Sequence, residues 1–572
     1  MAADRTYALE PGDVERARSW RPELGVETLV LLGALLLIMC NLAFWRGALA
    51  GRSIGELWTW RFVVATCAGL VALHFFAICL FVTRHTVRPL LAALITIGGV
   101  SGYFMYRYGV VLDGQMLRNV LHTDWQEAAE LLGVDTVSAI LLVLLAAATP
   151  WCFRLRRRAF GRALVIRCGA LAASLLLAVI AVAIAFQDLS SVLRNDGRLR
   201  HALTPANVLW ALGRAIADDA HASAVPSAPA ERAERVLVAA AGRKPVLFVM
   251  VVGETARAAN FALNGYARST NPELARLDVI NFPHATACGT STEVSLPCMF
   301  SPFGRAAYDA SRIRRHESLP QLLGRTGLRV IWVDNQSGCK GVCDGLEFHD
   351  VSHQQIAGLC ADGHCYDEVL LHTLKSIAAG ASTDTMVILH QIGNHGPAYF
   401  RRYPPQLKRF EPACERQELR LCSRDEIVNA YDNAIAYTDR FLADTIRFLG
   451  DVRSRFDVAL LYVSDHGESL GELGLYLHGM PFAIAPREQL EVPMLWWIPA
   501  ESARGIDVDI ACLRERATRQ ASHDNIYHSL LGLLAVRTQR YRSDLDVFHG
   551  CRGSDPEGSH RRIAELVSER AH

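Results

Sequence analysis

Five long apolar runs, all before residue 190, constrain the fold of this chain more than any other feature. They cover approximately residues 28–44, 62–82, 90–105, 137–152 and 168–186. A membrane-spanning helix needs roughly 20 apolar residues, and flanking interfacial residues make up the difference where a run is shorter. One such run also suits a buried core helix, but five in succession with basic residues between alternate pairs follow the membrane insertion rules. We therefore expect an α-helical membrane domain of five spans.

The placement of arginines sets the expected orientation. They precede the first run and lie between the second and third and between the fourth and fifth: Arg5, Arg16, Arg18, Arg21, Arg84, Arg88, Arg154, Arg156, Arg157, Arg158, Arg162 and Arg167. The positive-inside rule places these segments in the cytoplasm, so five spans put everything after residue 187 outside. Ala48-Leu49-Ala50 resembles a signal-peptidase site, but the long apolar stretch before it and four more runs after it favour an uncleaved signal anchor.

Composition divides the chain into four parts. Residues 1–187 form the membrane domain, with an outward-facing segment at 106–133. Residues 188–243 are polar, rich in alanine and contain proline, as in a linker. Residues 244–550 have the composition of a soluble domain, and we expect the charged tail at 551–572 to be mobile.

The cysteines independently support this topology. Five lie in or beside apolar runs and resemble small apolar residues: Cys40, Cys67, Cys79, Cys152 and Cys168. Ten follow residue 187, and eight of these form close pairs: Cys288 with Cys298, Cys339 with Cys343, Cys360 with Cys365, and Cys414 with Cys422. Cys512 and Cys551 remain as a more distant candidate pair. A cysteine zinc cluster needs C-x2-C repeats, which do not occur, so disulfides in an oxidising compartment are the better interpretation.

From residue 244 the sequence has an α/β pattern. Short apolar runs at residues 246–252, 329–333, 386–389 and 458–463 lack alternation, which suits strands covered on both faces. A polar cluster follows each run. Because ligands bind outside the carboxyl ends of parallel strands, we expect a mainly parallel central sheet with one crevice at these ends.

The polar clusters contain the components of a hydrolytic metal centre. Glu254, Asp465 and His466 offer carboxylate and imidazole ligands, which zinc commonly uses. Thr292 lies in a Gly/Ser/Thr-rich turn, and coordination to a metal is one way to activate its weakly nucleophilic hydroxyl. His395 and His478 could hold a second cation. Taken singly these signals are weak: the Asp465-His466 pair also suits a polar turn, and Thr292 alone suits a helix cap.

Together the segments resemble a known family, the lipid A phosphoethanolamine transferases, inner-membrane enzymes that include the mobile colistin-resistance enzymes. The resemblance extends from the first span to about residue 540. Its motifs are Gly253-Glu254-Thr255-Ala256-Arg257, Asn264-Gly265-Tyr266, Cys288-Gly289-Thr290-Ser291-Thr292, Pro297-Cys298-Met299-Phe300-Ser301, Asn394-His395-Gly396-Pro397, Asn429-Ala430-Tyr431-Asp432-Asn433, Ser464-Asp465-His466-Gly467-Glu468-Ser469 and Tyr476-Leu477-His478-Gly479-Met480-Pro481. It implies a sulfatase/alkaline-phosphatase-like α/β domain in the periplasm, carried by five membrane helices.

The resemblance also implies roles for single residues. Thr292 becomes the residue that carries phosphoethanolamine, and the first zinc site consists of Glu254, Thr292, Asp465 and His466. His395 and His478 match histidines that bind a second metal or the substrate phosphate. The remaining implied substrate-binding residues are Asn119, Thr123, Glu127, Gln336 and Lys340. Gln336 stands where relatives often have Asn, and Glu293 follows Thr292 where Ala is common, which bears on specificity.

Residues 119, 123 and 127 share one helix face, because side chains four apart are neighbours. Without the resemblance, a solvated stripe is the simpler interpretation of that face.

The resemblance implies an overall function. The chain would transfer phosphoethanolamine from phosphatidylethanolamine to a phosphate of lipid A or lipopolysaccharide, through a covalent threonine intermediate, with one tightly bound Zn2+ and a site for a second ion. Added ethanolamine would lower the negative charge of the envelope and confer resistance to polymyxin and other cationic peptides. We expect a monomer in the bacterial inner membrane. With 59 basic and 58 acidic residues, the chain has no general nucleic-acid footprint.

Three alternatives remain open at this stage. A related transferase could act on core heptose, Kdo or a protein, or could move phosphoglycerol. A sulfatase is disfavoured because the Cys/Ser-x-Pro-x-Arg motif is missing around Thr292. A non-catalytic membrane scaffold or transporter is disfavoured because the spans contain no paired Pro/Gly-broken helices and the polar residues lie outside them.

Overall fold

The fold is described from a computed structural model covering residues 21–50, 52–112, 114–122, 128–129, 131–195, 199, 201–213, 216, 230–235, 243–361, 364–416 and 419–553. The described residues group into two compact units. The first comprises Met1–Asp113 and Leu132–Leu212, and the second comprises Gly114–Leu131 and Gly213–His572. The outward segment predicted at 106–133 thus contributes its central part to the second unit.

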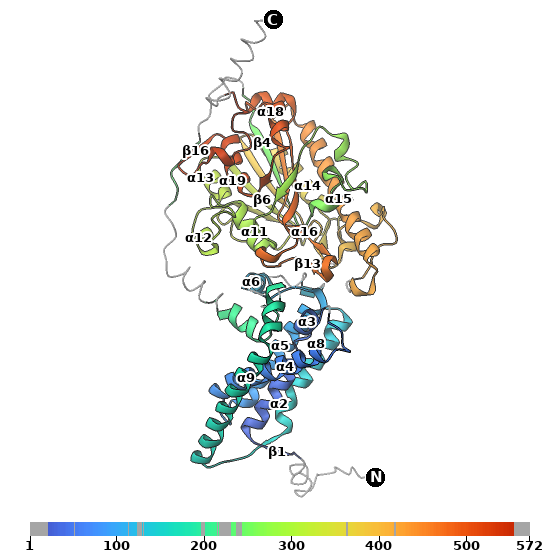
Figure 1. Cartoon of the computed structure of the whole chain (residues 1–572). Helices are drawn as coiled ribbons and strands as arrows, with labels where there is room; N and C mark the ends of the chain where they lie inside the picture. Colours follow the sequence, from blue (N-terminus) through green and yellow to red (C-terminus); the bar gives the residue numbers. More distant parts are fainter. Residues whose placement is uncertain are drawn as a thin grey trace, which may run out of the picture. The chain divides into compact units, whose positions relative to one another are not determined.

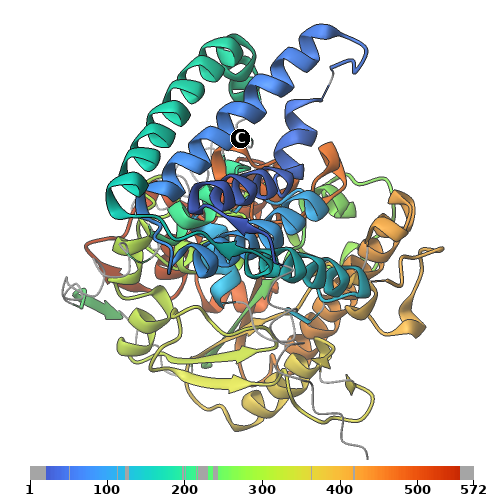
Figure 2. The ribbon, with the colours of Figure 1, turned by 90° about the horizontal axis from the view of Figure 1, so that it is seen from below.

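The first unit is helical. Its elements are α2 (Val26–Met39), α3 (Leu42–Ala48), α4 (Leu57–Phe81), α5 (Val87–Tyr108), α8 (Val134–Ala148), the 3-10 turn η1 (Thr149–Cys152) and α9 (Phe160–Asn195), with a short parallel pair of strands, β1 (Glu23–Leu24) and β2 (Arg154–Leu155). Within the described residues four helices are long and apolar enough to cross a membrane: Leu57–Phe81, Val87–Tyr108, Val134–Cys152 and Phe160–Phe186. Helices α4 and α9 run side by side (Figure 2).

The first predicted span is a bent pair rather than one straight helix. Helices α2 and α3 meet at 59° and reach the required length only together. The bend has a polar cause at Asn41, which is fully buried. Its side-chain amide donates to the carbonyls of Leu37 (2.8 Å) and Thr204 (2.9 Å), and its side-chain oxygen accepts from the Thr204 backbone N–H (2.7 Å). Asn41 therefore satisfies backbone groups that a broken helix leaves open.

The second unit is built on an eight-stranded, mainly parallel sheet, as predicted. The strand order is β15 (Ala521–Ser522), β5 (Ile280–Thr286), β14 (Glu491–Trp497), β11 (Asp457–Ser464), β4 (Val246–Gly253), β10 (Thr385–His390), β6 (Arg329–Asp334) and β7 (Glu347–Asp350). Only β14 runs antiparallel to its neighbours β11 and β5. The four predicted apolar runs are the four central parallel strands, and each is buried on both faces.

Helices cover both faces of this sheet (Figure 1). The core on one face includes side chains of α11 (Thr292–Met299), α13 (Leu319–Arg325), α17 (Ala500–Gly505), α18 (Ile510–Arg516) and α19 (Asp524–Leu533). The core on the other face includes α14 (Glu368–Gly380) and the long α15 (Arg424–Asp451). Strand β4 serves both, since Phe248 and Met250 enter the first core and Leu247 and Val249 enter the second. This explains why its sequence shows no polar alternation.

Small elements and disulfides complete the second unit. Helices α12 (Ala310–Arg314) and α16 (Arg487–Leu490) are short, and three two-stranded ribbons pair β8 (Cys360–Ala361) with β9 (His364–Cys365), β12 (Ser469–Leu470) with β13 (Tyr476–Leu477), and β3 (Ala233–Arg235) with β16 (Val536–Thr538). The structure joins the four close cysteine pairs and also Cys512 with Cys551. The five cysteines in or beside the apolar runs are free.

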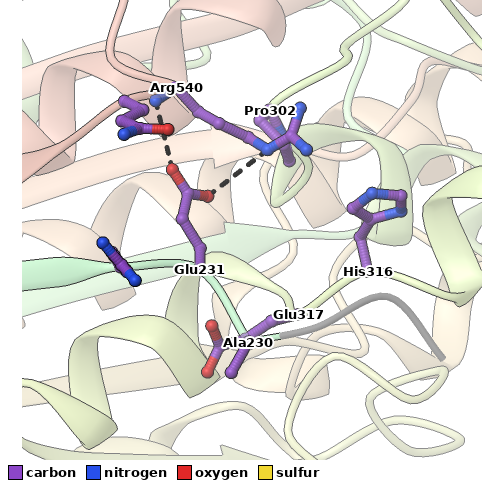
Figure 3. A pocket seen from close by; sticks show the side chains of 8 residues that line it. Ala230, Glu231, Pro302, His316, Glu317 and Arg540 are labelled. Atoms are coloured by element: carbon purple, nitrogen blue, oxygen red, sulfur yellow. Dashed lines mark hydrogen bonds and ion pairs between the residues drawn. The ribbon is translucent and has the colours of Figure 1, made fainter.

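Residues 230–235 attach to the second unit through charged side chains. Arg325 donates to the backbone carbonyl of Glu231 (2.5 Å), and the Glu231 carboxylate accepts from the backbone N–H of Arg540 (3.1 Å). Ala230, Glu231 and Arg232 border a pocket of about 520 Å³ together with Pro302, His316, Glu317, Gln539 and Arg540 (Figure 3). None of the predicted metal or substrate residues lines it.

Asp384 joins this attachment to the central sheet. Its carboxylate accepts from Arg235 (2.8 Å), from Arg243 (2.5 Å) and from the backbone N–H of Val246 at the start of β4 (2.7 Å). The side chains of Arg235 and Asp384 are each 7% exposed. An ion pair this buried is expensive to break, because the remaining charge stays in a poorly solvated place.

We therefore expect Asp384→Ala to lower the free energy of unfolding of the second unit by about 3 kcal/mol. The measurement is urea unfolding of the purified chain in detergent, with β4 and β10 followed by hydrogen-exchange mass spectrometry. Arg487→Ala serves as the matched control, because its partner Glu491 is on the surface and such pairs contribute about 1 kcal/mol or less. Equal effects of the two substitutions would contradict the role of Asp384.

Candidate active site

The site begins at the carboxyl ends of the two most central strands. Strands β4 and β11 are parallel and in register, with Gly253 opposite Ser464. The next residue of each strand is a carboxylate, so Glu254 and Asp465 lie side by side. The Asp465 backbone N–H donates to the Gly253 carbonyl (2.9 Å), which continues the ladder by one bond. The sheet register alone therefore brings together two acids more than 200 positions apart in sequence.

Glu254, Asp465 and His466 form a compact group that could hold a metal ion. All three are fully buried, and one ligand atom from each lies within 4.8 Å of the others. The His466 Nε2 atom is 3.3 Å from Glu254 Oε1 and 3.4 Å from Asp465 Oδ2. The other ring nitrogen of His466, Nδ1, lies 2.9 Å from the Gly467 carbonyl, which fixes the ring so that Nε2 faces the carboxylates.

The ligand atoms of this group fit a zinc ion in two respects: their chemistry, and a buried oxygen that lacks a hydrogen-bond partner. Carboxylate oxygens and an imidazole nitrogen are ordinary zinc ligands. Asp465 Oδ2 is buried and has no hydrogen-bond partner, whereas Asp465 Oδ1 accepts from the backbone N–H groups of Thr255 (3.1 Å) and His466 (2.7 Å). A buried carboxylate oxygen without a donor is costly, and a cation would satisfy it.

The local electrostatics point to the same need for a cation. Burial and the charge of Glu254 raise the pKa of Asp465 to about 7. Burial opposes the charged form of His466, but Asp465 and Glu254 outweigh it and raise the pKa of that ring to about 10. Without a metal, a proton on His466 thus balances part of the negative charge.

Thr292 is the first residue of α11 and faces this group. Its hydroxyl donates to Glu254 Oε2 (2.9 Å) and lies 3.5 Å from His466 Nε2. The turn before it is tied to the sheet through Ser295, whose hydroxyl donates to the Asp465 carbonyl (2.5 Å) and accepts from the Gly289 N–H (3.0 Å). A Cβ atom on Gly289 would lie 2.6 Å from the Val294 side chain, so the turn requires glycine there.

His395 and His478 lie on the other side of the group. The His478 ring centroid is 4.4 Å from that of His466 and 5.3 Å from that of His395. Burial lowers the pKa of each of these two rings to about 3. Both are therefore neutral near pH 7, and a neutral imidazole can bind a metal or a phosphate oxygen.

Glu468 was quoted in the motif Ser464–Ser469, but the sequence did not assign it a role. Its carboxyl group is fully buried, 3.5 Å from His478 Nδ1. Burial raises its pKa well above the ordinary value. A second acid two residues after His466 could have been suspected, but sequence spacing does not show on which side of the strand end it falls.

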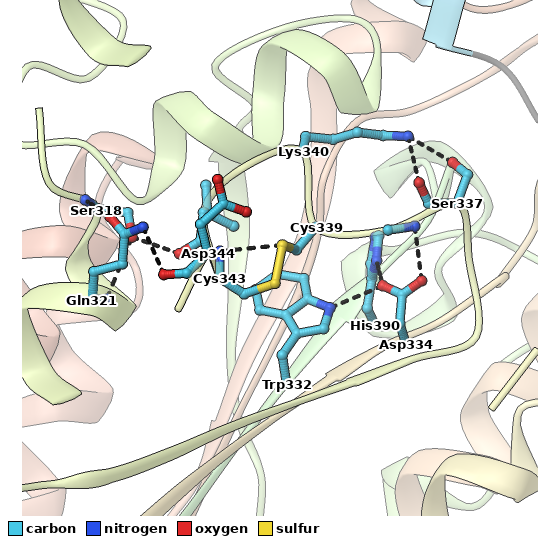
Figure 4. Close-up of a disulfide and its surroundings, with 12 residues drawn as sticks. Ser318, Gln321, Trp332, Asp334, Ser337, Cys339, Lys340, Cys343, Asp344 and His390 are labelled. Carbon is cyan, nitrogen blue, oxygen red and sulfur yellow. Dashed lines mark hydrogen bonds and ion pairs between the residues drawn. A yellow bond between two sulfur atoms is a disulfide. The ribbon is translucent and has the colours of Figure 1, made fainter. Parts of the chain in front are cut away.

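The loop after β6 carries two of the predicted substrate residues. Gln336 donates from Nε2 to Glu254 Oε2 (3.0 Å). It therefore contacts the metal group (Glu254, Asp465 and His466), which could hold an ion. Lys340 Nζ donates to the carbonyl (2.9 Å) and hydroxyl (2.7 Å) of Ser337 in its own loop, and the disulfide Cys339–Cys343 closes the loop (Figure 4).

Asp334, a residue for which the sequence predicted only a strand-end position, organises this loop (Figure 4). Its carboxylate accepts from Trp332 Nε1 (2.8 Å), from the backbone N–H groups of Gln336 (3.2 Å) and Gly338 (2.9 Å), and from His390 Nδ1 (2.7 Å). His390, on the strand β10 itself, packs against Trp332 with ring centroids 5.5 Å apart. Asp334 and His390 thus position Gln336 without themselves contacting the metal group.

The predicted residues of the outward segment are only partly visible. Asn119 lies on α6 (Gly114–His122), whereas Thr123 and Glu127 lie outside the described residues. Helix α6 packs against α11, and Met116 Sδ lies 2.6 Å from where a Cβ atom of Gly479 would be. This places α6 beside the loop that carries His478.

Comparison with known proteins shows which protein family this chain is similar to. Residues 247–536 match the Sulfatase model, and residues 70–220 match the model described as Phosphoethanolamine transferase EptA/EptB. Phosphoethanolamine transferase EptA of Salmonella typhimurium is 36% identical over 93% of this chain and 98% of its own length. Phosphatidylethanolamine transferase Mcr-1 of Escherichia coli is 36% identical over 80% of this chain and 85% of its own length.

A solved structure agrees over most of the chain. The integral membrane lipooligosaccharide phosphoethanolamine transferase A of Neisseria meningitidis superposes with a TM-score of 0.88 at 33% identity, covering 93% of this chain and 100% of that protein. The likeness therefore includes the helical unit as well as the sheet.

Zinc affinity should depend steeply on pH, because both Asp465 and His466 must lose a proton to bind the ion. With pKa values of about 7 and about 10 in the metal-free protein, the logarithm of the affinity should rise by about one per pH unit above pH 7 and by about two per unit below it. The measurement is competition with a chelator between about pH 6 and about pH 9. Asp465→Asn should remove the steeper phase, and an affinity that does not change with pH would contradict the assignment.

Proposed function

The chain belongs to the EptA/EptB family of phosphoethanolamine transferases, and from this premise we propose that it transfers phosphoethanolamine from phosphatidylethanolamine to a phosphate of lipid A. The observation that carries the proposal is the Thr292 hydroxyl, held on Glu254 Oε2 at the N-terminus of α11 and directly beside the Asp465–His466 pair. A hydroxyl in this position is a nucleophile, and the free N–H groups at the start of α11 favour a bound phosphate.

In the first step, Thr292 Oγ1 attacks the phosphorus of phosphatidylethanolamine. The bond from phosphorus to the glycerol oxygen breaks, and diacylglycerol leaves. Glu254 Oε2, which already accepts the hydroxyl hydrogen, takes the proton from Thr292 and keeps it until the second step, and the diacylglycerol oxygen receives a proton from water as it departs. The product is a phosphoethanolamine ester of Thr292.

In the second step, a phosphate oxygen of the acceptor attacks the same phosphorus. The Thr292 oxygen leaves and recovers its proton, so the enzyme returns to its starting state. His395 and His478, both neutral at pH 7, would hold the nonbridging phosphoryl oxygens through their ring N–H groups without adding charge that competes with the metal. Gln336 would keep Glu254 in position during both steps.

Zinc would be held by Glu254, Asp465 and His466 together with Thr292, and when bound it lowers the pKa of a coordinated hydroxyl and stabilises charge on phosphoryl oxygens. A second ion, if bound, would use His395 and His478. Glu468, buried beside His478, is available to the same ion.

The substrates and the apolar helices together place the enzyme in a membrane. Both donor and acceptor are lipids, so a chain with membrane-spanning helices can take them directly from one leaflet. The arginine distribution orients the second unit toward the periplasm, and local disulfides suit that oxidising compartment. We propose a monomeric inner-membrane enzyme whose product carries less negative charge and binds polymyxin and related cationic peptides less well.

Thr292→Ala should abolish transfer, with a loss of at least about 10³-fold, because it removes the hydroxyl that lies on Glu254 Oε2 beside His466. The measurement is mass spectrometry of lipid A after incubation in proteoliposomes with phosphatidylethanolamine. Thr292→Ser is the matched control, since it keeps the hydroxyl, and it should retain measurable activity and an adduct with the mass of phosphoethanolamine. Full transfer by Thr292→Ala would exclude the covalent route. Modification of Kdo or heptose in place of a lipid A phosphate would identify the related transferase that acts on another acceptor.

A further inference from the structure

Arg305 lies between the two segments that carry the proposed nucleophile and one of the proposed phosphate histidines. The central carbon of its guanidinium group is 3.7 Å from the ring centroid of Phe482 and 5.0 Å from that of Tyr308. Its Nη1 atom donates to the carbonyl of Cys288 (3.4 Å). Cys288 begins the turn that leads to Thr292, and Phe482 follows His478 by four positions. The guanidinium group therefore borders the active site.

The charge of Arg305 is only partly offset by the protein, because the Asp524 carboxylate acts on it without forming an ion pair with the guanidinium group. In the part of the chain that the structure covers, no carboxylate forms an ion pair with its guanidinium group. The acid nearest in the fold, Asp524, uses its two oxygens for the backbone N–H groups of Arg305 (2.6 Å) and Ala306 (3.2 Å). Burial lowers the pKa of Arg305. A partly buried cation without a counter-ion is costly by itself and favours an anionic ligand.

Tyr308 supplies a hydroxyl at the same place. Within the described residues, its hydroxyl forms no hydrogen bond with the protein. Burial raises the pKa of Tyr308, while the charges of Arg305, Arg314 and Arg118 act to lower it and that of Glu293 acts to raise it. Three guanidinium groups therefore act on this hydroxyl, and a donor in such a field binds an anion well.

These cations come from three elements around the nucleophile. Arg118 lies on α6 and Arg314 on α12, and α11 packs against both helices (Figure 1). Residues 302–316 contain four arginines (305, 312, 314 and 315) and one acid, Asp309, a balance of +3 in a chain of net charge +1. Positive charge is thus concentrated in residues 302–316, although the chain as a whole is almost neutral.

We propose that Arg305 and Tyr308 form an anion subsite that binds a second phosphate group of the acceptor, separate from the phosphate that attacks. This inference rests on the proposed function. The donor is an unsuitable occupant: its only phosphate must reach Thr292, and its ammonium group would be repelled by the arginines. In an acceptor glycolipid with more than one phosphate, one phosphate can react at Thr292 while a second remains free to bind the subsite. A guanidinium group binds phosphate through two parallel hydrogen bonds, which fixes orientation as well as affinity.

The test separates the two half-reactions. The first is measured without acceptor, as diacylglycerol release from phosphatidylethanolamine in proteoliposomes and as phosphoethanolamine adduct by intact-protein mass spectrometry. The second is measured as transfer at increasing concentrations of lipid A with two phosphates or with one. Arg305→Gln removes the guanidinium group with its two parallel N–H donors (the fork), Tyr308→Phe removes the hydroxyl, and Arg312→Gln is the matched control. The control also removes one positive charge nearby, but Arg312 packs 3.7 Å over Phe303, and its charge is not among those that act on Tyr308.

We expect Arg305→Gln to leave the first half-reaction within about twofold and to raise KM for two-phosphate lipid A about tenfold, in line with loss of a charge-assisted hydrogen bond. With one-phosphate lipid A, the wild-type enzyme and Arg305→Gln should differ by less than about twofold, because the lost contact is then absent from both. Tyr308→Phe should show a smaller loss of the same kind, and Arg312→Gln should resemble the wild type. Arg305→Lys keeps the charge without the fork and should fall between the two.

Three results would overturn the subsite. They are an unchanged KM for two-phosphate lipid A in Arg305→Gln, an equal loss with both forms of lipid A, and slowed adduct formation without acceptor. Zinc content and the unfolding midpoint identify a variant that is misfolded, and Arg305→Lys then supplies the decisive comparison. A wild-type enzyme that forms no phosphoethanolamine adduct would instead contradict the proposed function, which distinguishes the two failures.

Discussion

The register between β4 and β11 is the constraint on which the active site depends. Because Gly253 and Ser464 are paired, the carboxylates of Glu254 and Asp465 must emerge together from two buried strands. Two buried acids side by side repel each other, and His466 alone balances only one of them. A divalent cation would reduce this repulsion. The sheet keeps the two carboxylates adjacent, because a shift in the register of either strand would disrupt both hydrophobic cores. The fold therefore creates the demand for a metal before any ligand geometry is considered.

Carboxylates that never touch the metal group position the loops around it. Asp334 accepts four hydrogen bonds and holds the turn that presents Gln336. Asp367 has the same function after β10, where it accepts from the backbone N–H groups of Ile392 (3.0 Å) and Gly393 (3.1 Å), just before His395. Burial raises the pKa of Asp367 to about 6. Each loop is thus fixed by a buried acid at its base, which leaves the side chains at its tip available for substrate.

The parts of the fold that follow from local pattern could be predicted from the sequence. The four apolar strands lack alternation because both of their faces are buried, and the close cysteine pairs need only a short loop. Glu254, Asp465 and His466 could be grouped because Glu254 and Asp465 directly follow such strands and His466 is the next residue after Asp465. In contrast, the break at Asn41 depends on Thr204, more than 160 residues away, and local hydropathy does not contain that contact. The link from Cys512 to Cys551 likewise depends on how α18 packs at the end of the chain.

Functional residues outside the motifs escaped prediction for a related reason. Arg305 resembles any surface arginine in sequence, and only the folded chain shows that it lies between Phe482 and Tyr308, with no ion pair to a carboxylate among the described residues. Asp334 was visible as a polar residue after a strand, but its bond to His390 requires β6 and β10 to be neighbours. Sequence motifs identify groups that take part in the chemistry itself. Groups that orient those residues, or that recognise parts of the substrate distant from the reacting atom, become visible only through the contacts they make.

The charges around Thr292 differ on its two sides, and this difference can give the reaction its direction. Glu254 and Asp465 form an acidic side that suits a metal ion, whereas His395 and His478 are rings that are neutral at pH 7 and, in the proposed mechanism, would donate N–H hydrogen bonds to phosphoryl oxygens. Arg305 and its neighbouring arginines add a third, cationic region at the border of the site. An incoming zwitterionic headgroup gains little from that region, but a polyanionic acceptor gains from it at every extra phosphate. In the proposed mechanism, the site would therefore attract a polyanionic acceptor more strongly than uncharged diacylglycerol, whose return would reverse the first step, and the threonine ester would be passed forward rather than back.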